Sequence, residues 1–540
     1  MSSEALLALL GAAVAVYALL PTERRLDLRL QLSGIDWSII VGAILLVHYI
    51  KFYPVFATTG LAPMLGPWRF GFDADIASYG IVATAVVGVS LHARFRKLPP
   101  SSLQTFHELT ETLLQNGKYA ELGFLLERHF DALFEISADD TSWRFRLLRT
   151  LNPRPIPPIV TMKDGEVEVV YRPPRTCVAA KIAKALAAPL ERAPKRREEA
   201  LDVLQLILKH EGFAEALAAT RPALALAILS RKARDRFGFQ DVFIAALLRN
   251  TRSQLYSELR NNQNLRSLHR YAILPANRIL SFYLTNPRVG EELAIYKPIG
   301  DFALAEVRRR RRLGSAEDEY LREVDQFDTD GAWRCPIYAT IRFFDIMILE
   351  SIHAKIDWHM WLYYLPLIVR EMAANVQRRS DVDESREWPT PYHYLIYEAI
   401  SSMRSWIEES ADIAVDTGQP IVLDESARLE NGSIPKSATI AIGQALAAVL
   451  TSPEFTGRYK GALLEMALYR HKQMVSNALT ASLARSLTNA VAAGGTIEFP
   501  KSGYRDELVE AFRHVDLIRR FELRDDVALK EIIKEAETTP

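Results

Sequence analysis

The segment from Glu350 to His359 holds the densest set of groups that could do chemistry. Glu350 and His353 are three positions apart, and Asp357 follows four positions after His353. In a helix, residues at these spacings share one face, so the three side chains could converge on one ion. A Glu-x-x-His pair is also the ligand motif of di-metal sites in helical bundles. Glu350, His353 and Asp357 therefore form a candidate metal site.

The sequence supplies only some of the ligands that a di-metal site requires. A di-metal bundle needs another Glu-x-x-His pair and two further glutamates, and the sequence has no second pair. The alternative is a polar network or a solvated helix face. We expect no cofactor, and we expect the aromatic residues that follow Asp357 to lie in a core or an interfacial patch.

Motifs of common enzymes are absent from the sequence. There is no GxxxxGK[ST], no GxGxxG after a strand, no GxSxG and no HExxH. Cys177 and Cys335 are the two cysteines, which excludes a disulfide scaffold and an all-cysteine zinc site. Arg175 and Arg334 stand near them and could lower a thiol pKa, but no base is placed beside either thiol. These features argue against an enzyme, although an enzyme with an unrecognised site remains an alternative.

A run of five arginines is the strongest local charge in the chain. It comprises Arg308, Arg309, Arg310, Arg311 and Arg312. It ends a basic zone, residues 249–312, which holds 12 Arg and one Lys against five acids. The acidic zones 315–335 and 408–430 follow. Three interpretations stay open: pairing within the protein, contact with anionic lipid headgroups, or contact with nucleic acid.

Three apolar runs near the N-terminus predict a membrane anchor. They cover about residues 5–20, 37–56 and 76–93. A bilayer core of about 30 Å needs roughly 20 helical residues, and aromatic residues flank the runs as in interfacial belts. We therefore predict three transmembrane helices within residues 1–98 and a lipid bilayer as partner.

Basic residues next to these runs predict the orientation of the anchor. They lie in the loop after the first run and directly after the third: Arg24, Arg25, Arg29, Arg94, Arg96 and Lys97. Because basic loops stay inside, we expect the N-terminus outside and the large C-terminal part in the cytoplasm. The chain is then an integral protein of a bacterial inner membrane.

The rest of the chain is predicted to be mainly α-helical, irregular or solenoid-like, with a few short strands. Helical periodicity predicts two helices in 102–134, broken at Asn116 and Gly117, and further helices in 177–285, 335–378, 392–414, 434–490 and 504–537. Alternating residues predict strands at 166–171, in a proline-rich insertion at 152–175, and at 26–32 and 496–499. The expected cytoplasmic regions are 101–315 and 316–540.

Composition narrows the functional classes. The 540 residues hold 66 basic and 66 acidic side chains, which disfavours a basic nucleic-acid coat or a charged disordered tail. We expect a non-enzymatic, membrane-anchored sensor, scaffold or effector, for example in bacterial stress or phage defence. It would act on unidentified protein partners and could form homo-oligomers. The alternatives are a channel or transporter subunit, and an enzyme or nucleic-acid-acting domain.

Overall fold

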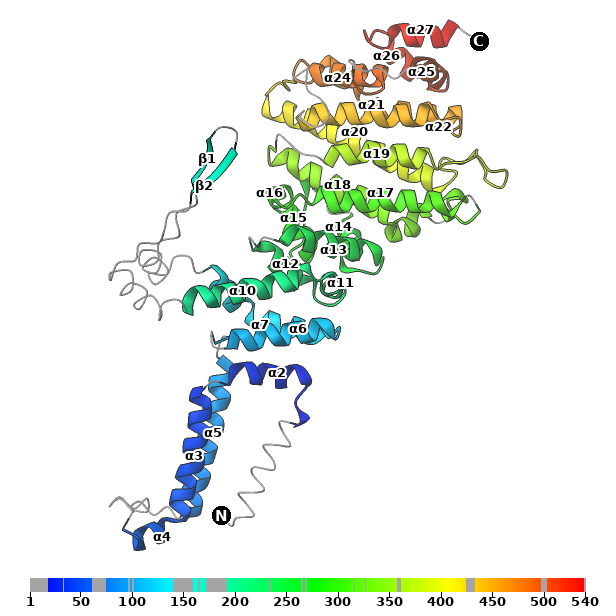
Figure 1. The fold of residues 1–540 in the computed structure, drawn as a ribbon. Coiled ribbons are helices and arrows are strands. Elements are labelled where there is room, and N and C mark those ends of the chain that lie inside the picture. Colours follow the sequence, from blue (N-terminus) through cyan, green and yellow to red (C-terminus); the bar gives the residue numbers. More distant parts are fainter. Residues whose placement is uncertain are drawn as a thin grey trace. The chain divides into compact units, whose positions relative to one another are not determined.

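Helices make up nearly all of the described part of the computed structural model, and its few strands form two small hairpins (Figure 1). The mainly α-helical prediction is therefore confirmed. The structure describes residues 18–32, 34–60, 74–95, 98–99, 102–138, 159–163, 166–170, 192–231, 233, 235–263, 266–267, 270–314, 316–325, 327–356, 361–423, 433–496 and 503–538.

The chain divides into two compact units, which are described separately. The first consists of Met1–Leu217 and Ala233–Asp235, and the second of Ala218–Lys232 and Arg236–Pro540. These units are defined by contacts. The predicted division into 1–98, 101–315 and 316–540 stays a prediction.

Two long apolar helices pack against each other in the first unit. They are α3 (Gly34–Lys51) and α5 (Ala74–Phe95), here called the α3–α5 hairpin. Both are long and apolar enough to cross a membrane, and no other described helix is. Three spans were predicted, and the described residues show two helices that could cross a membrane. The first predicted span, 5–20, lies outside the described residues except for its last three positions.

The second predicted span is shorter than expected. It was predicted to continue to residue 56, but α3 ends at Lys51 and a separate short helix, α4 (Tyr53–Thr58), begins after Phe52. Pro54 lies in the first turn of α4. Since proline has no N–H and its ring clashes with the preceding turn, it is favoured at a helix start and disfavoured inside a continuous helix.

The predicted strand at 26–32 is wrong, because this segment forms helix α2 (Thr22–Gln31). The leucines alternate, but the buried positions are Asp27, Leu30 and Gln31. These are three and four residues apart, which is the spacing of one helix face. Packing of that face on helix α7 (Tyr119–Ala138) overrides the local period of two.

Three more helices complete the ordered packing of the first unit. They are α6 (Leu103–Gln115), α7 and α10 (Arg192–Lys209), and each packs on the other two. The predicted break at Asn116 and Gly117 is confirmed, and Gly117 has the positive φ of 66° that favours glycine. Helix α11 (Glu211–Thr220) follows α10 along the chain.

The proline-rich insertion contains a β-hairpin. The predicted strand at 166–171 is present as β2 (Glu166–Val170), and it pairs antiparallel with β1 (Ile159–Lys163). It does not pair with 26–32, which is helical. The third predicted strand, 496–499, lies almost entirely outside the described residues.

The second unit consists of many helices of moderate length. Its helices are α12 (Pro222–Ser230), α13 (Arg236–Arg249), α14 (Gln254–Asn262), α15 (Arg278–Leu284), α16 (Pro287–Glu292), α17 (Tyr296–Leu313), α18 (Pro336–His353), α19 (Trp361–Ala373), α20 (Pro391–Thr417), α21 (Ile434–Leu450), α22 (Gly457–Ala467), α23 (His471–Ser476), α24 (Ala481–Ala493), α25 (Tyr504–Arg513), α26 (Leu517–Leu523) and α27 (Lys530–Thr538). A second small hairpin, β3 (Arg266–Ser267) and β4 (Arg270–Tyr271), was not predicted.

These helices pack in a regular order within the second unit (Figure 1). Helix α17 packs on α19, α19 on α21, and α21 on α24. In parallel, α18 packs on α20, α20 on α22, α22 on α25, and α25 on α27. Trp406 and Tyr392 of α20 are among the largest fully buried side chains of this second series. The chain therefore alternates between two rows of helices and buries a continuous apolar core between them.

Candidate functional site

The arginine run occupies the last turns of α17, and its side chains leave the helix in different directions. Arg310 is buried, whereas the other four arginines are exposed. Arg310 lies three residues after Val307 and seven after Ala303, and both of these are fully buried. It therefore belongs to the apolar face of the helix. The helical period places Arg310 on the buried face of the helix, although the five arginines look alike in the sequence.

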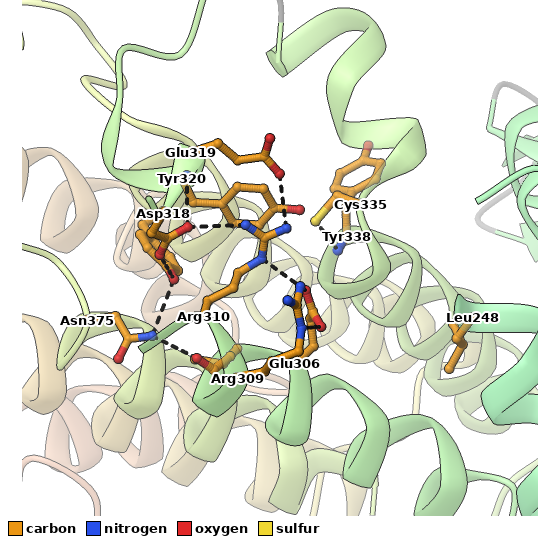
Figure 2. Close-up of polar contacts among 12 residues, drawn as sticks. Leu248, Glu306, Arg309, Arg310, Asp318, Glu319, Tyr320, Cys335, Tyr338 and Asn375 are labelled. Atoms are coloured by element: carbon orange, nitrogen blue, oxygen red, sulfur yellow. Dashed lines mark hydrogen bonds and ion pairs between the residues drawn. The ribbon is translucent and has the colours of Figure 1, made fainter. Parts of the chain in front are cut away.

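Arg310 lies at the centre of a dense polar cluster (Figure 2). Its guanidinium donates to Glu306 at 3.0 Å, to Asp318 at 3.1 Å and to Glu319 at 3.1 Å. The ring of Tyr320 lies against the guanidinium, with 3.4 Å between the ring centroid and Cζ. Burial by itself lowers the pKa of Arg310, but Tyr320, Glu306 and Glu319 more than offset it, so the pKa is raised.

Asp318 extends this cluster to two further helices. Besides Arg310, its carboxylate accepts from the Tyr320 backbone N–H at 3.0 Å and from the Tyr392 hydroxyl of α20 at 2.7 Å. Asn375, just after α19, donates to the carbonyl of Val307 at 2.9 Å. The cluster therefore joins α17, α19 and α20. An arginine used in this way stabilises the fold and is not available to an external ligand.

Two other arginines of the run also have partners within the second unit. Arg309 makes a bidentate contact with Glu306, and Arg308 donates to Glu371 of α19 at 3.1 Å. Arg311 and Arg312 are exposed, and neither has a hydrogen-bond or ion-pair partner in the described part of the chain. Of the three interpretations, pairing within the protein accounts for Arg308, Arg309 and Arg310. Of the five arginines, Arg311 and Arg312 therefore have side chains that could contact an anion.

The structure separates the candidate metal ligands. Glu350 accepts from the Arg270 side chain at 2.5 Å and from the Tyr271 backbone N–H at 3.0 Å, so both of its oxygens hold β4 against α18. His353 instead faces α20, where its Nε2 lies 2.9 Å from Glu409. Asp357 lies outside the described residues.

Among the described residues, no three His, Cys, Asp or Glu side chains are grouped so that they could hold a metal ion. The geometry therefore supports the polar-network interpretation for Glu350 and His353. With Asp357 outside the described part, the metal hypothesis itself stays a prediction.

Next to Glu350 is a buried network that the sequence reasoning missed. Asp345 of α18 accepts from the Tyr271 hydroxyl at 2.8 Å and from Trp406 Nε1 at 3.0 Å. It also lies 3.2 Å from Arg342, which in turn donates to the Tyr271 hydroxyl at 3.0 Å. Asp345 is the one acid within the apolar stretch 343–349. An isolated acid in such a stretch was the sequence signal that could have revealed this network.

Cys335 is a capping residue rather than a reactive thiol. It is fully buried, and its sulfur accepts from the Tyr338 backbone N–H at the start of α18. Burial raises the pKa of the Cys335 thiol, against the expectation that a neighbouring arginine lowers it. Cys177 lies outside the described residues.

One polar pair lies at each end of the α3–α5 hairpin. Asp36, in the first turn of α3, lies 2.6 Å from Nδ1 of His92, near the end of α5. At the other end, Lys51 of α3 is paired with Asp75 of α5. The partners are 24 and 56 residues apart, so the sequence alone does not show that they pair.

A further buried acid fixes α2 on α7. Asp27 is 2% exposed and lies 3.0 Å from His129 Nε2 and 2.5 Å from Arg128. Gln31, one turn later on α2, donates to the same carboxylate at 2.8 Å. The helix that precedes the hairpin is therefore held by a specific polar contact.

Comparison with known proteins gives no relative to set beside these sites: no family model, no curated protein and no solved structure matches the chain.

Proposed function

We propose that this protein is a membrane-anchored helical scaffold, in which the α3–α5 hairpin lies in a bilayer and the second unit binds other proteins. The single observation that carries the proposal is the outward face of the hairpin. Its large apolar side chains are exposed on both helices: Leu45 is 65% exposed, Trp37 56%, Val87 55% and Leu91 52%. A hairpin with such a surface is unfavourable in water and favourable in lipid.

The dimensions of the hairpin support a bilayer location. Helix α3 has 18 residues and α5 has 22, which corresponds to about 27 and 33 Å at 1.5 Å per residue. The hydrocarbon core of a bilayer is about 30 Å thick. A core helix of a soluble protein passes the same length test, but most of its apolar side chains would be buried by the protein.

The charged pairs support the same location. Asp36 and Lys51 are separated by about 22 Å along α3, and no Asp, Glu, Lys or Arg lies between them. Between them, His48 Nδ1 donates to the Ile44 carbonyl of its own helix at 2.9 Å. Charged groups are thus confined to the ends of the apolar stretch, where they are paired. An unpaired charge deeper in the bilayer would be costly.

The orientation follows from the positive-inside rule. Arg24 and Arg29 precede the hairpin, and Arg94, Arg96 and Lys97 end or follow it. We propose that this end of the hairpin faces the cytoplasm of a bacterial inner membrane, with α4 on the opposite side. The predicted span 5–20 would then place the N-terminus outside.

Support for a scaffold comes from the second unit. Its two rows of helices, in which each helix packs on the next of its own row and α20 also packs on α21 of the other row, suit a solenoid-like array. Such arrays present extended surfaces that bind other proteins. The side chains that best suited catalysis or metal binding, Glu350 and His353, are engaged in contacts between helices. Action through protein contacts therefore fits the geometry better than catalysis.

Cysteine labelling in whole cells tests the proposed topology. Thr59→Cys, beyond the α4 end of the hairpin, and Lys118→Cys, between α6 and α7, are introduced singly in a Cys177→Ser background. Both positions are exposed, and the remaining Cys335 is buried. A reagent that cannot cross the inner membrane should label Thr59→Cys and spare Lys118→Cys until the membrane is opened. Labelling of both positions in intact cells would contradict the proposal.

A further inference from the structure

Helix α2 presents arginines on the face that α7 does not cover. Its buried positions, Asp27, Leu30 and Gln31, lie on the side that packs on α7. Arg25 and Arg29 are four positions apart, and the helical period places both on the opposite side. Arg29 is exposed and Arg25 is half-buried. We call these two residues the α2 arginine pair.

The α2 arginine pair has no ion-pair partner in the part of the chain that the structure describes. Arg25 makes one long contact, at 3.5 Å from its Nη2 to the Thr22 hydroxyl. Arg24 differs, because its guanidinium lies over the Phe124 ring of α7, at 5.0 Å from Cζ to the ring centroid. Two guanidinium groups with unused donors on one helix face suit an oxyanion, and phosphate in particular.

The acidic side chains near α2 do not cancel this charge. Asp27 is buried in its contact with α7, and Glu23 lies four positions before it, on the same side of the helix. Asp36, at the start of α3, is 1% exposed and is held by His92. The four acids of α7 belong to the helix that covers the opposite side of α2. The uncovered face of α2 is therefore positively charged.

Chain connectivity keeps the α2 arginine pair close to the end of the α3–α5 hairpin. Helix α2 ends at Gln31 and α3 begins at Gly34, so the Cα atoms of these two residues lie at most about 11 Å apart. With the hairpin in a bilayer, α2 therefore lies at the membrane surface. The positive-inside rule puts this end on the cytoplasmic side, where the leaflet is anionic.

We propose that the α2 arginine pair binds the phosphate group of an anionic phospholipid in the cytoplasmic leaflet. This inference rests on the proposed membrane location of the hairpin. Each guanidinium donates to phosphate oxygens, and the contact of Asp27 with α7 keeps the uncovered face of α2 in place. A zwitterionic lipid also has a phosphate, but its headgroup carries a positive charge that the arginines repel. An anionic headgroup such as phosphatidylglycerol is therefore preferred.

Thermal unfolding of the full-length protein in mixed micelles tests this contact. Phosphatidylglycerol should raise the unfolding midpoint more than the same mole fraction of phosphatidylcholine, because a ligand stabilises the state that binds it. The apparent affinity for phosphatidylglycerol should fall about fivefold for each arginine replaced, and about 25-fold in the double variant Arg25→Gln, Arg29→Gln. Added salt should weaken the response of the wild type, since the contact is electrostatic.

Two further double variants control for charge and folding. Arg311→Gln with Arg312→Gln is the matched control, because both arginines are exposed and have no ion-pair partner among the described residues. It should respond to phosphatidylglycerol as the wild type does. Arg25→Lys with Arg29→Lys keeps the charge but loses the planar fork of donors. It should bind phosphatidylglycerol more tightly than the double glutamine variant, even if both are less stable than the wild type.

The lipid contact is overturned if Arg25→Gln with Arg29→Gln keeps the response of the wild type, or if the control at Arg311 and Arg312 loses it. It is also overturned if inorganic phosphate at the same concentration stabilises the wild type as the lipid does. Extraction at alkaline pH separates this inference from the proposed function. Wild type recovered in the soluble fraction contradicts the membrane location, whereas wild type that stays in the membrane without a preference for phosphatidylglycerol contradicts the lipid contact alone.

Discussion

His92, near the end of α5, lies 2.6 Å from the carboxylate of Asp36 in the first turn of α3, and Asp36 is 1% exposed. Because a carboxylate only accepts, the histidine Nδ1 donates this hydrogen bond. The contact joins the two ends of the α3–α5 hairpin that are farthest apart in sequence. It therefore sets how the two helices are aligned.

Removal of this contact should destabilise the hairpin. His92→Ala leaves a buried carboxylate without that donor, which typically costs about 1–3 kcal/mol. His48→Ala is the matched control, since His48 lies in the same hairpin and its Nδ1 donates to the Ile44 carbonyl of its own helix. Thermal unfolding in detergent should show a lower midpoint for His92→Ala than for His48→Ala. Equal midpoints would argue that the Asp36 contact does not align the helices.

Neighbouring arginines of the run should differ sharply in their effect on stability. Arg310→Ala leaves the buried carboxylate of Asp318 without its cationic partner, and loss of one member of a buried ion pair typically costs about 3–5 kcal/mol. Arg311→Ala removes an exposed side chain, and such changes usually stay within about 0.5 kcal/mol. Urea unfolding followed by circular dichroism measures both variants. A small effect of Arg310→Ala would show that the cluster in Figure 2 does not hold the helices together.

The close contact between α21 and α24 should tolerate no added methyl group. A Cβ on Gly443 of α21 would lie 2.3 Å from the Ala490 carbonyl oxygen of α24, whereas a Cβ on Gly238 of α13 would meet nothing within 4 Å. Gly443→Ala should therefore lower stability by about 1–3 kcal/mol, as overpacking does. Gly238→Ala should raise it by up to about 1 kcal/mol through helix propensity. Unfolding midpoints that move in the same direction would contradict this packing.

The free energy of unfolding should decrease as the pH is lowered, because of one buried histidine. Burial lowers the pKa of His393 to about 4, while in the unfolded chain it is about 6.5. Between these values the unfolded state binds one more proton than the native state, so this contribution is complete above about pH 6.5. It is lost as the pH falls towards 4, and amounts to about 3 kcal/mol.

The variant His393→Gln removes this titration. The free energy of unfolding of the wild type should therefore fall more steeply between pH 6.5 and 4.5 than that of His393→Gln. Urea titrations at several pH values compare the two slopes. Parallel slopes would show that His393 is not held neutral by burial against Phe455 and Tyr459.

Local patterns predicted most helices but not their partners. The break at Asn116 and Gly117 was readable because Gly117 stops a helix through its own backbone conformation. The strand expected at 26–32 failed because its alternation was local, while the buried face that fixes α2 depends on α7. Residues 504–537 were predicted to form one helix or a helix pair, and they form three helices, α25, α26 and α27. Asp516 caps the start of α26.

The candidate site illustrates the same limit. Spacing correctly showed that Glu350 and His353 lie on one helix. Glu350 is nevertheless held by Arg270, which is 80 positions away, and His353 by Glu409, which is 56 positions away. Periodicity states which face a residue occupies, but not which element covers that face. Partners across the fold, such as Asp36 and His92, therefore emerge only with the structure.

A charge placed on the outward face of the hairpin tests the central claim most directly. Leu45 is 65% exposed near the middle of α3, where an arginine in a bilayer costs about 2.5–3.5 kcal/mol or more. Leu45→Arg should reduce the protein that resists extraction from membranes at alkaline pH, whereas Val422→Arg, on an exposed apolar side chain of the second unit, should not. If Leu45→Arg stays as membrane-bound as the wild type, or if the wild type is recovered in the soluble fraction, the α3–α5 hairpin does not lie in a bilayer.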